Sequence, residues 1–121
     1  PAHRLHSHAA WPITRRQRGV RSRRTTFVEI GPVTAFAPAA AELLIPFPNL
    51  RTGWGLDAHW AAVAAQRGWP IGIVDATPVG HTLRPVAADY PREDAIAEAQ
   101  EFLRGRPYLS RDEIRTVGIQ R

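Results

Sequence analysis

The chain has 121 residues, enough for one domain with a buried core, and it contains no cysteine. The lack of cysteine excludes both a disulfide framework and a thiolate metal site. Hydrophobic residues make up 44% and charged residues 22%, which is typical of a soluble fold. The longest uncharged run, residues 30–41, is interrupted by glycine and proline and is much shorter than the ~20 residues of a membrane helix. The sequence therefore predicts a cytoplasmic protein without a membrane span.

The formal net charge of +5 is concentrated near the start of the chain. Every basic residue is arginine, many arginines fall within residues 1–24, and no acidic residue precedes Glu29. We expect residues 1–24 to form a basic strand and loop arm, and residues 25–121 to form a single domain. The arm is either a solvated loop or a surface that meets the phosphates of a nucleic acid or a nucleotide sugar.

Three histidines open the arm, at His3, His6 and His8, before Trp11. His6 and His8 would point to the same side of a strand and could bind a metal. The alternative, which we take as the prediction, is a polar segment leading from strand to loop.

Two short β-branched and aromatic runs follow the arm, at residues 25–30 and 33–36, and both predict strands. Glu29 is a carboxylate within the first run. It either faces solvent on an alternating strand or lines a cleft. Residues 38–44 then predict a short helix with proline in its first turn.

The most informative stretch is residues 53–81, which read as loop, helix, strand and loop. A helix is predicted to begin near Asp57 and to end at Gly68, with one apolar stripe formed by Leu56, Trp60, Val63 and Ala64. Asp57 at a helix start has two interpretations. It stabilises the helix by accepting backbone N–H bonds, or it serves catalysis.

Residues 69–75 predict a strand that ends at Asp75, and the ends of strands in α/β sheets are common ligand sites. His81 follows in a loop, where it is either a loop residue or a ligand. Later in the chain, residues 91–104 predict a helix, and the capping-box pattern at residues 110–113 predicts a last short helix with Ile114 and Val117 facing inward.

Three motifs resemble a known family: FVEIGP at residues 27–32, GWGLD at residues 53–57 and GIVDATPVGH at residues 72–81. The pattern is similar to the C-terminal half of a GT-A-fold glycosyltransferase, and most of all to bacterial glycosyltransferase-like proteins. The resemblance implies an α/β fold: a partial, C-terminal portion of the GT-A fold, with a short mixed sheet and three to four helices. It also implies a piece of a longer protein that lacks an N-terminal, donor-binding half.

The resemblance also implies roles for individual residues. Asp57 matches the acidic residue that contacts the acceptor sugar and acts as general base in inverting members. The turn of Gly53, Trp54 and Gly55 would shape the acceptor wall. Glu29 and Trp11 are further candidates for substrate binding near the cleft.

His81 matches a histidine that helps to hold a divalent metal, Mn²⁺ or Mg²⁺, against the diphosphate of the donor. The family's Asp-x-Asp metal motif occurs nowhere in the 121 residues, so metal binding is expected to be weak or absent in this chain. The prediction depends on Asp57 and His81 opening into a common pocket.

The leading hypothesis is transfer of a sugar from a nucleotide-sugar donor to a hydroxyl acceptor. The alternative is a non-enzymatic basic α/β module that binds nucleic acid or another polyanion. No nucleic-acid-binding motif supports this alternative, which makes nucleic acid the less favoured partner. The sequence leaves the oligomeric state open.

Overall fold

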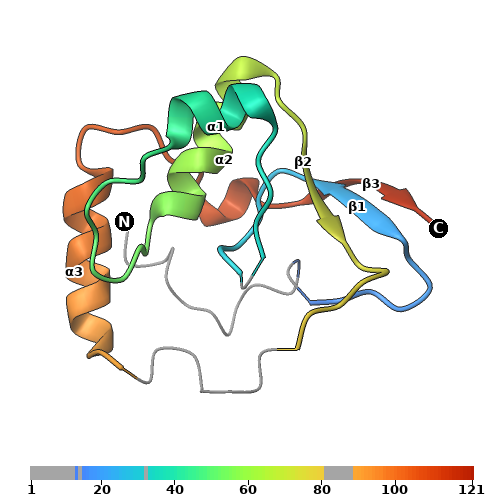
Figure 1. Cartoon of the computed structure of the whole chain (residues 1–121), viewed down its shortest axis with the longest axis horizontal. Coiled ribbons are helices and arrows are strands. Elements are labelled where there is room, and N and C mark those ends of the chain that lie inside the picture. The colour runs from blue at the N-terminus through green and yellow to red at the C-terminus, as the bar shows by residue number, and fades with distance from the viewer. Residues whose placement is uncertain (1–12, 14, 32, 81–88) are drawn as a thin grey trace.

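The computed structural model describes residues 13, 15–31, 33–80 and 89–121. Its elements follow the order β1 (Ser22–Thr25), α1 (Pro38–Leu44), α2 (Leu56–Arg67), β2 (Ile71–Val74), α3 (Arg92–Leu103), a 3₁₀ turn at Arg111–Glu113 and β3 (Thr116–Gln120). Within these residues the protein is an α/β structure with three α-helices beside one small sheet (Figure 1).

The sheet has three strands in the order β2-β1-β3, with β1 in the centre. Both pairings are antiparallel, so the expected mixed sheet is wrong for the described part of the chain. Arg23 lies opposite Ile73 on one side and Ile119 on the other. β1 begins before residue 24, where the predicted basic arm ends, and the last arginines of that segment therefore belong to the sheet.

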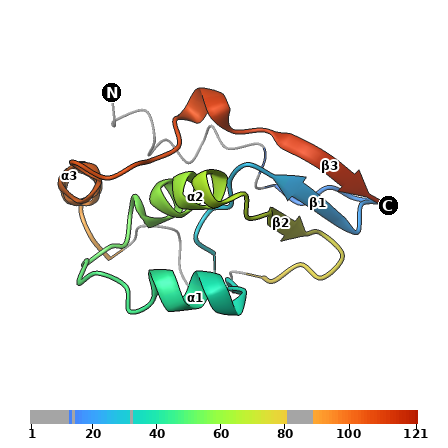
Figure 2. The ribbon, with the colours of Figure 1, turned by 90° about the horizontal axis from the view of Figure 1, so that it is seen from above.

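Helix α2 is the centre of the fold, with α1, α3 and the sheet arranged around it (Figure 2). Seven of its twelve residues are buried. Leu56 and Trp60 pack with Phe102 and Leu103 of α3 in one cluster, whereas Ala61 packs with Phe27 and Leu109 in a second. The buried surface of α2 is therefore wider than the single apolar stripe predicted from the sequence. Alanines on the remaining sides let neighbouring segments approach closely, and the Leu109 N–H donates to the Ala58 carbonyl at 2.9 Å.

Several predicted elements are confirmed. The helix at residues 38–44 is α1, the central helix ends at Gly68 in a left-handed C-cap, and the predicted strand at 69–75 contains β2. The helix predicted for residues 91–104 is α3. These elements have local signals: proline at a helix start, glycine at a helix end, and a β-branched run.

The predictions for the first and last strands along the chain are wrong. The first strand occupies Ser22–Thr25 rather than residues 25–30, and residues 33–36 form no strand. The capping box at Ser110 is present, with the Ser110 N–H and Oγ both donating to Glu113 at 2.8 Å, but it starts only one 3₁₀ turn. The chain then enters β3, where Val117 is 53% exposed instead of facing inward.

Among the described residues no helix is long and apolar enough to cross a membrane.

Candidate functional site

The turn before α2 is built on two glycines in the left-handed region, with φ of 73° at Gly53 and 93° at Gly55. A side chain at either position would be strained. A Cβ atom at Gly55 would also lie 3.4 Å from Ala99 Cβ and Leu103 Cγ of α3. Gly55 is the N-cap of α2, so the close approach of the two helices fixes where the turn lies.

Glu98 of α3 holds the segment that leads into this turn. Its carboxylate accepts hydrogen bonds from the backbone N–H groups of Arg51 at 2.6 Å and Thr52 at 2.8 Å, and from Thr52 Oγ1 at 2.6 Å. Burial alone would raise the pKa of Glu98, but the hydrogen bonds from Thr52 and Arg51 outweigh it and the pKa lies below its ordinary value. Glu98 is therefore an ionised anchor for the turn, and nothing in the local sequence pattern indicates it.

Trp54 is half-buried, and its ring is fixed by Tyr90, which lies just before α3. The indole Nε1–H donates to the hydroxyl of Tyr90 at 3.0 Å. The two rings meet edge to face at 83°, with centroids 6.4 Å apart. This arrangement gives the expected acceptor wall a defined orientation.

Asp57 is the second residue of α2, because the helix begins at Leu56. Oδ1 accepts the N–H of the next residue, Ala58, at 2.8 Å, and the negative charge lies in the first turn, where the helix dipole favours it. Oδ2 accepts the N–H of Ile30 at 3.4 Å, a long hydrogen bond from a loop far away in the sequence. The half-buried carboxylate thus lies between the first turn of α2 and the segment that contains Glu29, which is also half-buried.

Trp11 and His81 lie outside the described residues, as do His3, His6 and His8. The common pocket expected for Asp57 and His81 therefore stays a prediction. Within the described ranges, no three His, Asp or Glu side chains lie close enough together to hold a metal ion.

Asp75, at the end of the predicted strand, is buried in an ion pair instead of being open to a ligand. Its side chain and that of Arg23 are fully buried and form a two-pronged ion pair, with Nε–Oδ2 at 2.7 Å and Nη2–Oδ1 at 3.1 Å. Oδ1 also accepts the N–H of Gln17 at 2.8 Å. Burial would raise the pKa of Asp75, but the bonds from Arg23 and Gln17 lower it overall. The expected ligand-binding position is thus occupied by the protein's own guanidinium group.

The candidate site that the described residues form is therefore the turn at residues 51–57. In this turn Asp57 contacts the loop at residue 30, and Glu98 and Tyr90 hold the turn in place. Comparison of the chain with protein-family models, with curated proteins and with solved structures finds no match in any of the three.

Proposed function

We propose that this chain is the acceptor-side part of a glycosyltransferase that moves a sugar from a nucleotide-sugar donor to a hydroxyl acceptor, with Asp57 as general base. The observation that supports the proposal is the contact between Asp57 Oδ2 and the Ile30 N–H. It joins two of the three motifs on which the family resemblance rests, FVEIGP and GWGLD. These motifs are 27 residues apart at this contact, so their association is a property of the fold.

The chemistry fits a positioned carboxylate. The acceptor hydroxyl would give its proton to Asp57 as its oxygen bonds to the anomeric carbon, and the bond from that carbon to the diphosphate would break. A positioned general base of this kind contributes about 10²–10⁴-fold in rate. The hydrogen bonds from Ala58 and Ile30 orient the carboxylate. Trp54, fixed by Tyr90, would supply an aromatic surface for the sugar ring.

Binding of the nucleotide-sugar donor is proposed to involve residues outside the described part of the chain. Among the described residues, no group of three His, Asp or Glu side chains could hold a metal ion, and the proton transfer to Asp57 does not involve one. We propose that His81 helps to hold a Mn²⁺ or Mg²⁺ ion against the donor diphosphate, and that a donor-binding half supplies the rest of the donor site.

The test uses the natural gene product that contains this sequence. The protein is incubated with a panel of nucleotide sugars and hydroxyl acceptors, with Mn²⁺ or Mg²⁺, and release of nucleoside diphosphate is measured beside the mass of the product. We expect Asp57→Asn to lower the rate by about 10²-fold or more. Asp112→Asn, at an exposed position, is the matched control and should leave the rate unchanged. Full activity in Asp57→Asn would reduce Asp57 to a helix-stabilising residue.

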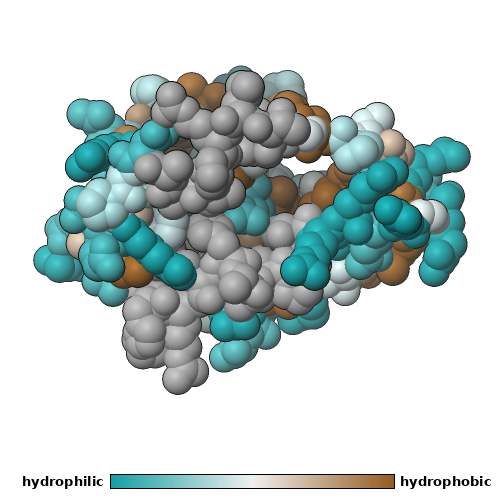
Figure 3. All heavy atoms as spheres, turned by 90° about the horizontal axis from the view of Figure 1, so that it is seen from below, coloured by the Kyte–Doolittle hydropathy of each residue, from teal (hydrophilic) through white to brown (hydrophobic). Residues whose placement is uncertain are grey.

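A second candidate, polyanion binding, is favoured by exposed arginines at Arg15, Arg18, Arg21 and Arg24. Figure 3 shows hydrophilic side chains at both ends of the molecule, including the end that carries the sheet. Against it, Arg23 is buried in an ion pair and Arg16 donates to the Asp75 carbonyl at 3.0 Å. A salt titration separates the candidates. Four phosphate contacts predict a slope of about −3 to −4 in log K against log salt, whereas donor binding should depend on the divalent metal.

A further inference from the structure

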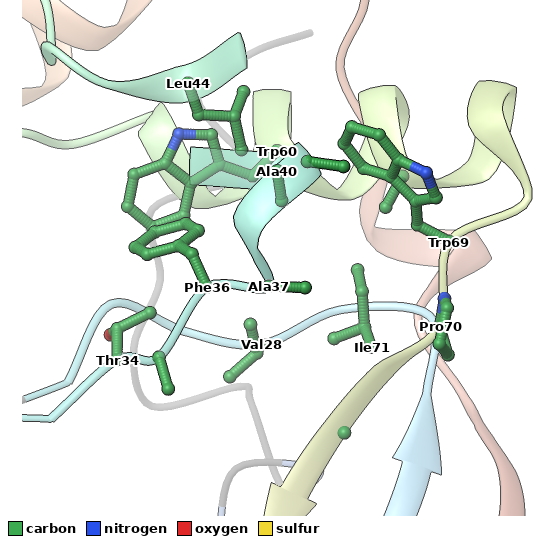
Figure 4. Close-up of a pocket in the computed structure, with 14 residues that line it drawn as sticks. Val28, Thr34, Phe36, Ala37, Ala40, Leu44, Trp60, Trp69, Pro70 and Ile71 are labelled. Carbon is green, nitrogen blue, oxygen red and sulfur yellow. The ribbon is translucent and has the colours of Figure 1, made fainter. Parts of the chain in front are cut away.

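A pocket that none of residues 53–57 lines offers a further candidate site. It has a volume of about 230 Å³ and lies between α1, the middle of α2 and the start of β2. In Figure 4 the rings of Phe36 and Trp60 form one side and the ring of Trp69 the other, while Val28 and Ile71 point between them. Alanines from both helices line the remaining wall.

The aromatic walls are held from outside the pocket. Phe36 meets Trp60 edge to face, with centroids 5.1 Å apart, and Phe47 packs on Trp60 at 5.3 Å. On the opposite side, the guanidinium carbon of Arg67 lies 5.4 Å from the centroid of Trp69. These contacts stabilise each ring in its place. The pocket is therefore preformed, and a ligand would not have to order its walls.

The lining determines the charge of the ligand. None of the described residues that line the pocket is ionisable, and their only polar side-chain atoms are the hydroxyl of Thr34 and the indole nitrogens of Trp60 and Trp69. A charged ligand would lose its hydration here without gaining a counter-charge, which is costly. An uncharged ring would bury apolar surface and could stack or pack edge to face with the three aromatic walls.

The volume determines the size of the ligand. An apolar cavity of about 150 Å³ is enough to bind benzene, whereas sites for drug-sized molecules start at about 300 Å³. The pocket lies between these values. We propose that it is a binding site for an uncharged aromatic group of one or two rings. Binding requires neither Asp57 nor a sugar donor, so this site stands apart from the proposed function.

The test titrates the protein with 1-naphthol, a neutral two-ring probe, by calorimetry and by quenching of tryptophan fluorescence. Naphthalene-1-sulfonate, the same ring with a fixed negative charge, is the matched probe. We expect saturable one-to-one binding of 1-naphthol with a Kd of roughly 0.1–1 mM, in keeping with the small number of atoms that bind. The sulfonate should bind at least about tenfold more weakly.

Two variants of α2 locate the binding site. Ala64→Leu adds a branched side chain at a buried lining position and should raise the Kd of 1-naphthol about tenfold or more. Ala65→Leu, one residue along and exposed, carries the same substitution and should leave the Kd unchanged. If Ala64→Leu does not fold, Ala40→Leu fills the pocket from α1 and serves the same purpose. Absence of saturable binding, equal binding of the sulfonate, or an unchanged Kd in the folded filled variant would each overturn the proposal.

Discussion

The helix–strand unit from α2 to β2 has a carboxylate at each end, and their surroundings differ. Asp57 at the start is half-buried and receives hydrogen bonds from the backbone N–H groups of Ala58 and Ile30. Asp75 at the end is buried against the guanidinium of Arg23. Both are aspartates beside a turn, and the sequence alone offers each as a site residue.

The difference shows how the fold separates structural from functional candidates. A buried carboxylate with a bidentate guanidinium partner ties two strands and the segment at residue 17 together, and little of it remains for a ligand. A half-buried carboxylate oriented by backbone amides, on a turn that Glu98 and Tyr90 hold in place, resembles a preorganised site. Three substitutions sharpen this comparison.

The largest effect is expected at the buried ion pair. Asp75→Ala leaves the Arg23 guanidinium buried without its carboxylate, and breaking such a pair costs about 3–5 kcal/mol. Stability is measured by urea unfolding at pH 7. Arg24→Met is the control, because Arg24 is the next residue of β1 and is exposed, and its free energy of unfolding should change by less than ~0.5 kcal/mol. A loss under 1 kcal/mol in Asp75→Ala would show that the pair is not a main support of the sheet.

A smaller effect is expected at the turn. Gly55→Ala combines a left-handed φ of 93° with a new Cβ against Ala99 and Leu103, and should cost about 1–3 kcal/mol. Gly68→Ala is a matched control at the other end of α2. It has a φ of 66° but nothing within 4 Å of its added Cβ, so it reports the backbone strain alone, about 1 kcal/mol. Equal losses in the two variants would mean that contact with α3 does not set the position of the turn.

The elements that were predicted correctly have local causes. α2 and α3 show helical periodicity with proline or glycine at an end, and β2 is a compact isoleucine and valine run. β1 escaped prediction because the buried arginine in its middle has its charged partner, Asp75, 52 residues away. β3 escaped because its large apolar residues, Val117 and Ile119, lie on the exposed face of this edge strand, so hydropathy does not follow burial along it.

The candidate site divides in the same way. Asp57, Trp54 and the two glycines form a contiguous motif that can be recognised in the sequence. Their supports, Glu98 and Tyr90, come from a segment more than 35 residues later and carry no motif of their own. The aromatic pocket also joins α1, α2 and β2 through residues that each look like ordinary core positions. Sequence reasoning therefore singled out the candidate site residues more readily than the residues that hold them in place.

The smallest effect is expected at Glu98, and it depends on pH. The pKa of Glu98 is lower in the folded chain than its ordinary value of 4.5, so near that pH the unfolded chain binds more protons. The stabilisation is complete above about pH 4.5 and is lost as the pH falls through the folded-state pKa. Glu98→Gln should lower the free energy of unfolding by about 1 kcal/mol at pH 7 and flatten its fall in acid. Glu101→Gln, an exposed position on the same helix, should change neither. If the acid limb of Glu98→Gln matched that of the unsubstituted protein, the acid sensitivity would come from other carboxyl groups with a lowered pKa, such as Asp75 and Glu113. The turn would then be held by the contact of Gly55 with α3 rather than by charge.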